Sequence, residues 1–113
     1  MTYNKKDIIL VPFPFNDKPG FKKRPATIIS NDEHGKQYGK YICVAITSQE
    51  KPYGKERYEH KLRKTKSVGL LFDNQWVLPN KLFSIEDSII TKKLGTMDSS
   101  DFETLELMFQ DLF

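Results

Sequence analysis

Two short polar segments, each beside an apolar run, hold residue types that can handle a phosphate group. Lys22, Lys23 and Arg24 lead from a turn-prone loop into a predicted strand, which places Arg24 at the rim of a sheet. Thr47, Ser48 and Gln49 directly follow another apolar run and offer two hydroxyl groups and an amide. A hydroxyl pair at a strand end ordinarily caps a turn. It gains chemical interest where an arginine lies beside it, because the guanidinium fork matches phosphate oxygens.

A second basic segment, residues 50–67, interleaves aromatic rings with cations. It holds seven Lys/Arg residues against three acids. Aromatic faces stack on bases while Lys and Arg hold phosphates, which is how proteins bind single-stranded nucleic acid. The candidate binding residues of this segment are Tyr53, Lys55, Arg57, Tyr58, His60 and Lys61. Two solvated basic loops would give the same charge pattern, so both interpretations stay open.

Several other catalytic arrangements do not occur in the sequence. There is no Gly-rich phosphate loop, no closely spaced pair of histidines and no serine nucleophile elbow. The single Cys43 excludes an internal disulfide and a cysteine metal cluster, and its apolar neighbours favour a buried structural thiol. His34 and His60 could in principle cleave RNA by acid–base catalysis, although His34 is expected simply to be exposed. We expect no metal and no cofactor.

Length and charge distribution limit the remaining possibilities. At 113 residues the chain has room for one compact domain, expected over residues 1–113. The net charge is +3, but residues 1–24 and 50–67 are basic whereas residues 98–113 hold five acids and no base. No apolar run approaches the roughly 20 residues that span a bilayer, and no signal peptide is visible. With the lone cysteine, these features predict a cytoplasmic protein.

Short apolar runs rich in β-branched residues predict a mainly β fold. Pro12 and Pro14 should place the end of the first strand at a sheet edge or a bend. Residues 50–67 are expected to form a loop or an irregular hairpin. Strands are expected over 7–13, 25–30, 40–47 and 68–72, over 75–78 ended by Pro79, and around Ile89, Ile90 and Leu94.

The end of the chain has the periodicity of a helix. Asp98 or Ser99 can cap it, and acids occupy its early turns, where the helix dipole favours them. Its apolar residues recur at helical spacing and should pack on the sheet: Phe102, Leu105, Phe109 and Leu112. Many short strands with one terminal helix indicate a small barrel or a tightly curled sheet.

Three segments resemble, in order and spacing, the signature segments of the MazF/PemK toxin family. They are residues 7–15, residues 23–30 with the Arg-Pro-Ala sequence, and residues 45–49 with the Thr-Ser-Gln sequence. Residues 69–70, 76–82 and 90–95 are similar to later blocks of the same family, so the resemblance runs nearly end to end. Each segment alone is a weak signal, whereas the Arg-Pro-Ala strand together with the Thr-Ser-Gln strand end is fairly specific.

The resemblance implies an SH3-like β-barrel with a C-terminal helix, assembled as a homodimer. It implies a metal-independent endoribonuclease that cuts single-stranded RNA and leaves 2′,3′-cyclic phosphate and 5′-hydroxyl ends. The catalytic arginine and threonine of the family map onto Arg24 and Thr47. Lys22, Lys23, Ser48 and Gln49 would contact the substrate. A cognate antitoxin with an acidic, partly disordered segment is the implied protein partner.

Phe13, Phe15 and Trp76 are expected to be core or dimer contacts rather than surfaces on which bases stack.

One departure from the family concerns the first loop, where many members carry Gly-Ser-Glu. Residues 16–22 contain no glutamate here. This leaves open a folded toxin that no longer cuts RNA. A non-catalytic module of the same barrel, binding either DNA gyrase or RNA, is the other alternative, although a gyrase binder needs neither Arg24 nor Thr47.

Overall fold

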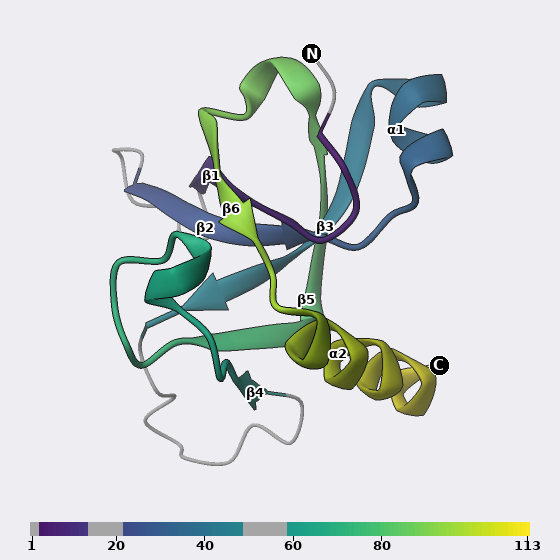
Figure 1. Ribbon diagram of the computed structural model, residues 1–113. Helices are drawn as coiled ribbons and strands as arrows, with labels where there is room; N and C mark the ends of the chain where they lie inside the picture. The colour runs from purple at the N-terminus through teal and green to yellow at the C-terminus, as the bar shows by residue number, and fades with distance from the viewer. Residues whose placement is uncertain (1–2, 14–21, 49–58) are drawn as a thin grey trace.

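The computed structural model describes residues 3–13, 22–48 and 59–113 (Figure 1). Six strands form one antiparallel sheet in the order β4-β5-β3-β2-β1-β6, so β4 and β6 are its two edges. The strands are β1 (Asp7–Phe13), β2 (Lys22–Ile28), β3 (Lys40–Thr47), β4 (His60–Lys61), β5 (Trp76–Glu86) and β6 (Lys92–Thr96). The helices are α1 (Asp32–Tyr38), α2 (Ser99–Leu112) and the 3-10 turns η1 (Lys66–Val68) and η2 (Asp87–Ile89).

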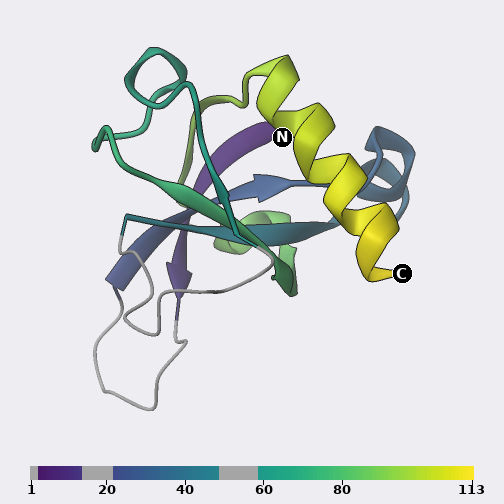
Figure 2. The ribbon, with the colours of Figure 1, turned by 90° about the horizontal axis from the view of Figure 1, so that it is seen from below.

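The sheet curls strongly and buries apolar side chains on both faces. Helix α2 lies across one face, as the view from below shows (Figure 2). Its Phe102 and Leu105 are buried there, and Phe109 packs against the same cluster. The core under α2 also contains Ile8, Val44, Ile46, Leu62, Leu70, Val77 and Met97. The core on the other face contains Ile9, Val11, Ala26, Ile28, Tyr41, Cys43, Ile85 and Ile90.

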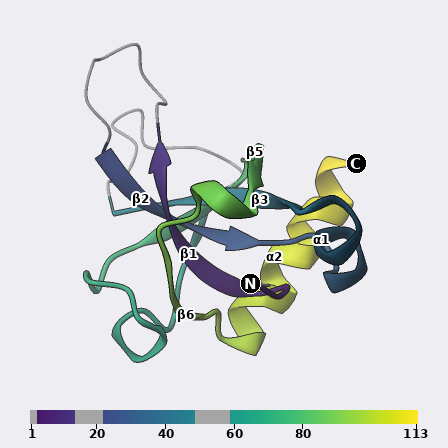
Figure 3. The same cartoon turned by 90° about the horizontal axis from the view of Figure 1, so that it is seen from above.

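The curl is tightened where the segment after η1 crosses β6. A methyl group added at Gly69 would overlap the carbonyl oxygen of Leu94, and one added at Gly95 would overlap that of Val68. Gly69 also has a φ of 93°, which favours glycine. Two glycines therefore allow the two backbones to touch, and this contact holds residues 69–72 against the end of the sheet opposite to α1 (Figure 3).

The long apolar runs gave correct predictions, since β1 and β3 have the predicted bounds and α2 begins after Asp98. The Asp98 carboxylate accepts a hydrogen bond from the Ser100 amide, and hydrogen bonding from Ser100 lowers the pKa of Asp98. Pro12 lies at an open edge as predicted, because β6 pairs with β1 only from Asp7 to Leu10. The curled sheet with its terminal helix confirms the predicted fold class.

Other predicted elements were wrong. The strand predicted over 68–72 is the end of η1 followed by an irregular segment. The strand at 75–78 does not stop at Pro79 but runs on to Glu86, because Pro79 sits where the register of β3 and β5 shifts and no ladder hydrogen bond is required. The last strand begins only at Lys92, since Ile89 belongs to η2. Helix α1 and strand β4 were not predicted.

Cys43 is fully buried, as predicted for a structural thiol, and burial raises its pKa to about 12. The thiolate is the reactive form of cysteine, so native protein should resist alkylation at pH 8. We expect mass spectrometry to find no iodoacetamide adduct on the native chain and one adduct in denaturant. Rapid labelling of the native protein at this residue would contradict the burial.

No helix in the described part of the chain is both long and apolar enough to cross a bilayer.

Candidate functional site

Arg24 and Thr47 lie where strands β2 and β3 part. The ladder between these strands runs from Ile28↔Cys43 to Ala26↔Ala45 and ends there. Continuing its register by two residues would bring Arg24 opposite Thr47. The start of β2 and the end of β3 instead diverge, as Figures 1 and 2 both show.

Pro25 explains why the ladder stops. The Ile29 amide donates a hydrogen bond to the Ile42 carbonyl of β3. Alternate amides of an antiparallel strand face the same neighbouring strand, so every second amide before Ile29 along β2 also faces β3. Position 25 is next in that series after Thr27, and a proline there has no N–H to donate. Because this hydrogen bond is missing, β2 and β3 separate beyond Pro25. The separation leaves an opening between Arg24 on β2 and Thr47 on β3.

A cavity of about 270 Å³ lies at this opening. Arg24, Thr47, Lys23, Ser48 and Lys92 contribute its charged and hydroxyl-bearing groups. Its apolar wall comes from Leu10, Pro25, Ile46, Leu70, Leu71, Phe72 and Leu94. Leu71 and Phe72 are 82% and 58% exposed, which is unusual for large apolar side chains. The cavity therefore combines three cations with an accessible apolar surface.

The Arg24 guanidinium is partly exposed, and within residues 3–13, 22–48 and 59–113 no side chain pairs with it. A cation without an internal carboxylate partner can bind an external anion at a smaller desolvation cost than one that must first break an ion pair. Among the described residues, therefore, no carboxylate competes with a phosphate group for this arginine.

A row of residues crosses the sheet at the same level. Val11 of β1 pairs with Arg24, while Trp76 of β5 pairs with both Thr47 and Lys61. Residues directly opposite one another in a sheet point to the same face. Their sequence neighbours Ile46, Val77 and His60 therefore point to the face that α2 covers, and Ile46 and Val77 are indeed buried in the core there.

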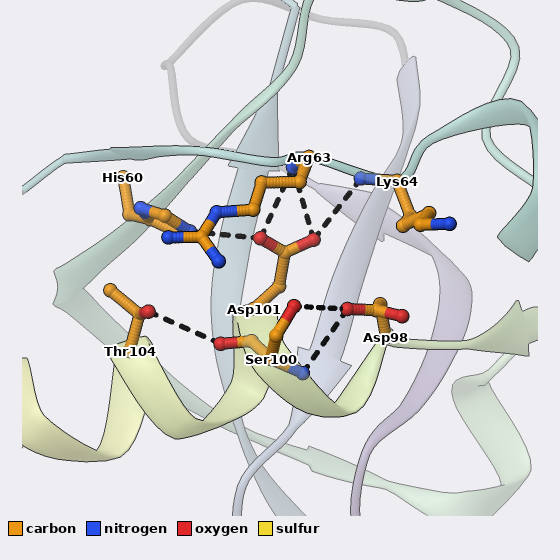
Figure 4. A network of polar contacts seen from close by, with 7 residues as sticks. All are labelled: His60, Arg63, Lys64, Asp98, Ser100, Asp101 and Thr104. Atoms are coloured by element: carbon orange, nitrogen blue, oxygen red, sulfur yellow. Dashed lines mark hydrogen bonds and ion pairs between the residues drawn. The ribbon is translucent and has the colours of Figure 1, made fainter.

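His60 faces the α2 side and contacts Asp101 rather than lining the cavity (Figure 4). Asp101 is fully buried in the first turn of α2 and accepts a 3.0 Å hydrogen bond from His60 Nε2. The same carboxylate accepts hydrogen bonds from the backbone amides of Arg63, at 3.0 and 3.1 Å, and Lys64, at 3.2 Å. This network ties residues 60–64 to α2 and sets the position of β4 beside β5. Substrate contact by His60 stays a prediction.

The other predicted residues are distributed as follows. Lys22 and Lys23 are exposed, with Lys22 on the face of Arg24 by strand alternation and Lys23 on the opposite one. Ser48 is exposed beside Thr47 at the end of β3. Lys61 is exposed, with its Nζ atom 5.8 Å from the ring centroid of Trp76. Predicted contacts that lie outside the described residues are Gln49, Tyr53, Lys55, Arg57 and Tyr58.

Sequence reasoning missed Lys92, the wall at 69–72, and the placement of Trp76. The sequence could not place Lys92 at the cavity, because only the pairing of Leu10 with Lys92 brings it there. Neither core cluster of the described residues includes Trp76, so it is not a core contact, whereas the predicted dimer contact stays a prediction. Its position next to Lys61 on the preceding strand, β4, could not be known without the register.

Comparison with solved structures supports the fold. An endoribonuclease from a Mycobacterial species, solved in complex with its cognate antitoxin, superposes with a TM-score of 0.77 at 10% identity, covering 96% of this chain and 92% of that one. MazF from Deinococcus radiodurans gives 0.76 at 16% identity, covering 99% and 96%. The MazE–MazF complex from the same organism gives 0.76 at 18% identity, with the same coverage. At such identities the likeness establishes the MazF-like fold alone.

A comparison with curated protein sequences gave no match. The family model for PemK-like, MazF-like toxins of type II toxin-antitoxin systems, in contrast, matches residues 4–113. The match covers nearly all of the 113 residues. The chain therefore belongs to the PemK-like, MazF-like toxin family of type II toxin-antitoxin systems.

Proposed function

We propose that this toxin is an endoribonuclease that cuts single-stranded RNA without a metal ion. The observation that carries the proposal is the opening between β2 and β3, which holds Arg24 and Thr47 on one cavity and leaves the guanidinium without a described partner. Membership of the toxin family supports it. So does the similar Mycobacterial protein, which is itself an endoribonuclease.

The reaction uses the RNA as its own nucleophile. The 2′-hydroxyl oxygen attacks the adjacent phosphorus, the bond from phosphorus to the 5′ oxygen breaks, and a 2′,3′-cyclic phosphate forms. The proton of the 2′-hydroxyl passes to solvent water, and a proton from Arg24, which solvent then replaces, reaches the departing 5′ oxygen, which becomes a 5′-hydroxyl. Because the attacking group is already in the substrate, no metal-activated water is needed.

Arg24 stabilises the charge that builds on the non-bridging phosphate oxygens. Its planar fork is protonated when the substrate binds and can donate two hydrogen bonds to them. The same guanidinium can pass a proton to the leaving 5′ oxygen, whereas its high proton affinity makes it a poor general base. Thr47 donates its hydroxyl hydrogen bond to the phosphate. Ser48 and Gln49 orient it or contact a base.

The partners of the protein are proposed on the same basis. Similar structures include MazE–MazF complexes and an endoribonuclease with its cognate antitoxin. We propose that an acidic, partly disordered antitoxin segment covers the cationic cavity here. We further propose that residues 1–113 act as a single toxin domain, as a homodimer, in the cytoplasm.

The direct test is incubation of purified protein with a long unstructured RNA in excess EDTA. We expect discrete fragments whose 3′ ends are cyclic phosphates, because internal attack gives no other first product. Intact RNA in the presence of folded protein would contradict the proposal. Fragments that appear only after a divalent metal is added back would contradict its metal-free chemistry.

RNA binding should weaken steeply with salt. Each phosphate that the protein neutralises on a single strand contributes about −0.7 to the slope of log K against log salt concentration. Five cations are exposed or partly exposed on the cavity or on strands β2 and β4, namely Lys23, Arg24 and Lys92 on the cavity, Lys22 on β2 and Lys61 on β4. We therefore expect a slope of about −2 to −3.5 with an uncleavable 2′-O-methyl RNA. A binding constant that does not change between low and moderate salt would show that these cations do not bind phosphates of the RNA.

A further inference from the structure

We infer that the Trp76 indole and the Lys61 ammonium form a subsite for one nucleotide of the bound strand, beside Arg24 and Thr47. The indole stacks on the base and the ammonium holds a phosphate. The inference rests on the proposed function for the identity of the substrate, but it concerns binding rather than cleavage. It gives Trp76 a role other than the core or dimer contact that the sequence predicts.

The register brings Thr47, Trp76 and Lys61 together, and Arg24 lines the same cavity as Thr47. Trp76 is directly opposite Thr47 on one side and Lys61 on the other. Directly opposite residues of antiparallel strands have Cβ atoms about 4.5–5.5 Å apart and share a face. The indole is therefore one strand away from the hydroxyl of Thr47. When a phosphate binds at Thr47, the base of that nucleotide or of the next nucleotide is within reach of the Trp76 indole.

Trp76 is not needed to fill a core. It is only partly buried, and neither apolar cluster of residues 3–13, 22–48 and 59–113 includes it. The next residue, Val77, is fully buried under α2, so strand alternation turns Trp76 to the opposite face. A large ring held at the surface by a regular strand is pre-ordered and loses little conformational freedom when a base stacks on it.

Lys61 supplies the charge that a nucleotide requires. Its Nζ atom lies 5.8 Å from the Trp76 ring centroid, in the range of a cation–π contact. No carboxylate of the described chain forms an ion pair with it. The backbone holds Lys61 in place, because the following Leu62 amide donates a 2.8 Å hydrogen bond to the Gln75 carbonyl. The ammonium can thus exchange the ring for a phosphate without breaking a salt bridge.

The charges on this face favour a polyanion. Strand alternation puts Lys22 on the same face as Arg24, so cations lie on this face at β2 and, with Lys61, at β4. Glu59, two residues before Lys61, is the acid nearest to the row in sequence, and its Oε2 atom is buried with no hydrogen-bond partner among the described residues. Cations flanking an aromatic ring are the arrangement that binds single-stranded nucleic acid.

The chain contains a single tryptophan, so its fluorescence reports on this subsite directly. The test titrates the protein with two dodecamers of equal charge: 2′-O-methyl-adenosine and an abasic tetrahydrofuran strand, which has the same phosphates and no 2′-hydroxyl. Neither strand can be cut, so binding is measured separately from cleavage. Binding is also followed by anisotropy of a labelled strand, which allows variants without tryptophan to be compared.

We expect the adenosine strand to quench the tryptophan emission and to bind about tenfold to a hundredfold more tightly than the abasic strand. Trp76→Leu should lose most of that preference, and Trp76→Phe should keep part of it. Lys61→Gln should reduce the salt slope by about 0.7 with either strand. The matched control, Tyr38→Leu, removes an exposed ring from α1 and should keep the wild-type preference.

An undiminished preference for bases in folded Trp76→Leu would overturn the inference. A change of sedimentation coefficient in that variant, with the preference intact, would make Trp76 a protein contact and overturn it likewise. A wild-type protein that fails to cut RNA but shows the quenching and the base preference would contradict the proposed function while upholding the subsite.

Discussion

Replacing Arg24 with alanine should slow RNA cleavage by about a hundredfold or more. A fixed donor that stabilises charge in a transition state is typically worth about 2.7–4 kcal/mol. In this protein Arg24 lies on the cavity at the β2–β3 opening with no described side chain to compete for it. The rate is to be measured in single-turnover reactions with excess EDTA, so that product release does not mask the chemical step.

The stability of the Arg24 variant should be close to that of the wild type. The side chain is partly exposed at the end of β2, and such substitutions usually change stability by no more than about 0.5 kcal/mol. Arg24→Lys keeps the charge but loses the two-pronged fork, so it should recover only part of the rate. Lys36→Ala on α1 is the control for loss of one positive charge. A folded Arg24→Ala protein with the full rate would remove this residue from the chemistry.

Replacing Asp101 with alanine should lower the free energy of unfolding by about 3 kcal/mol. The fully buried carboxylate accepts hydrogen bonds from two backbone amides and from His60. Each buried donor left without an acceptor costs about 1–3 kcal/mol. In a domain of this size such a loss corresponds to a fall of roughly 10–15 °C in Tm, which thermal denaturation followed by circular dichroism can measure.

Two variants separate this network from other effects on α2. Glu103→Ala removes an exposed acid of the same helix and should change stability by no more than about 0.5 kcal/mol. Asp101→Asn keeps the volume and one acceptor oxygen, so its loss should fall between those of the other two variants. A loss below about 1 kcal/mol in Asp101→Ala would mean that water satisfies the freed amides of Arg63 and Lys64.

The sequence predicted those elements whose own pattern determines them. The apolar runs of β1 and β3 and the periodic stripe of α2 need no partner to be recognised. Helix α1 was not predicted because it is short and contains Gly35, although Asn31 caps its start and Gly39 ends it. Gly35 is required there because a methyl group would overlap the ring of Tyr41, a contact that only the folded sheet creates.

The site was predictable to a similar extent. The segment signals and the family resemblance indicated Arg24 and Thr47, and both line the cavity. The role of Pro25 in opening the strands depends on which amides face β3, and the place of Lys61 depends on the two-residue strand β4. Strand β4 has only two residues and is held by Asp101, 41 residues after His60. No local pattern contains that information.

Removing the nucleophile tests whether the RNA attacks its own phosphate at the Arg24–Thr47 opening. An RNA that the protein cuts is prepared with one change, a 2′-deoxyribose on the 5′ side of the cut bond, and is incubated in excess EDTA. We predict that this bond stays intact while the all-ribose strand is cut at it. Cleavage of the deoxy bond at a comparable rate would show that the 2′-hydroxyl is not the nucleophile and would contradict the account.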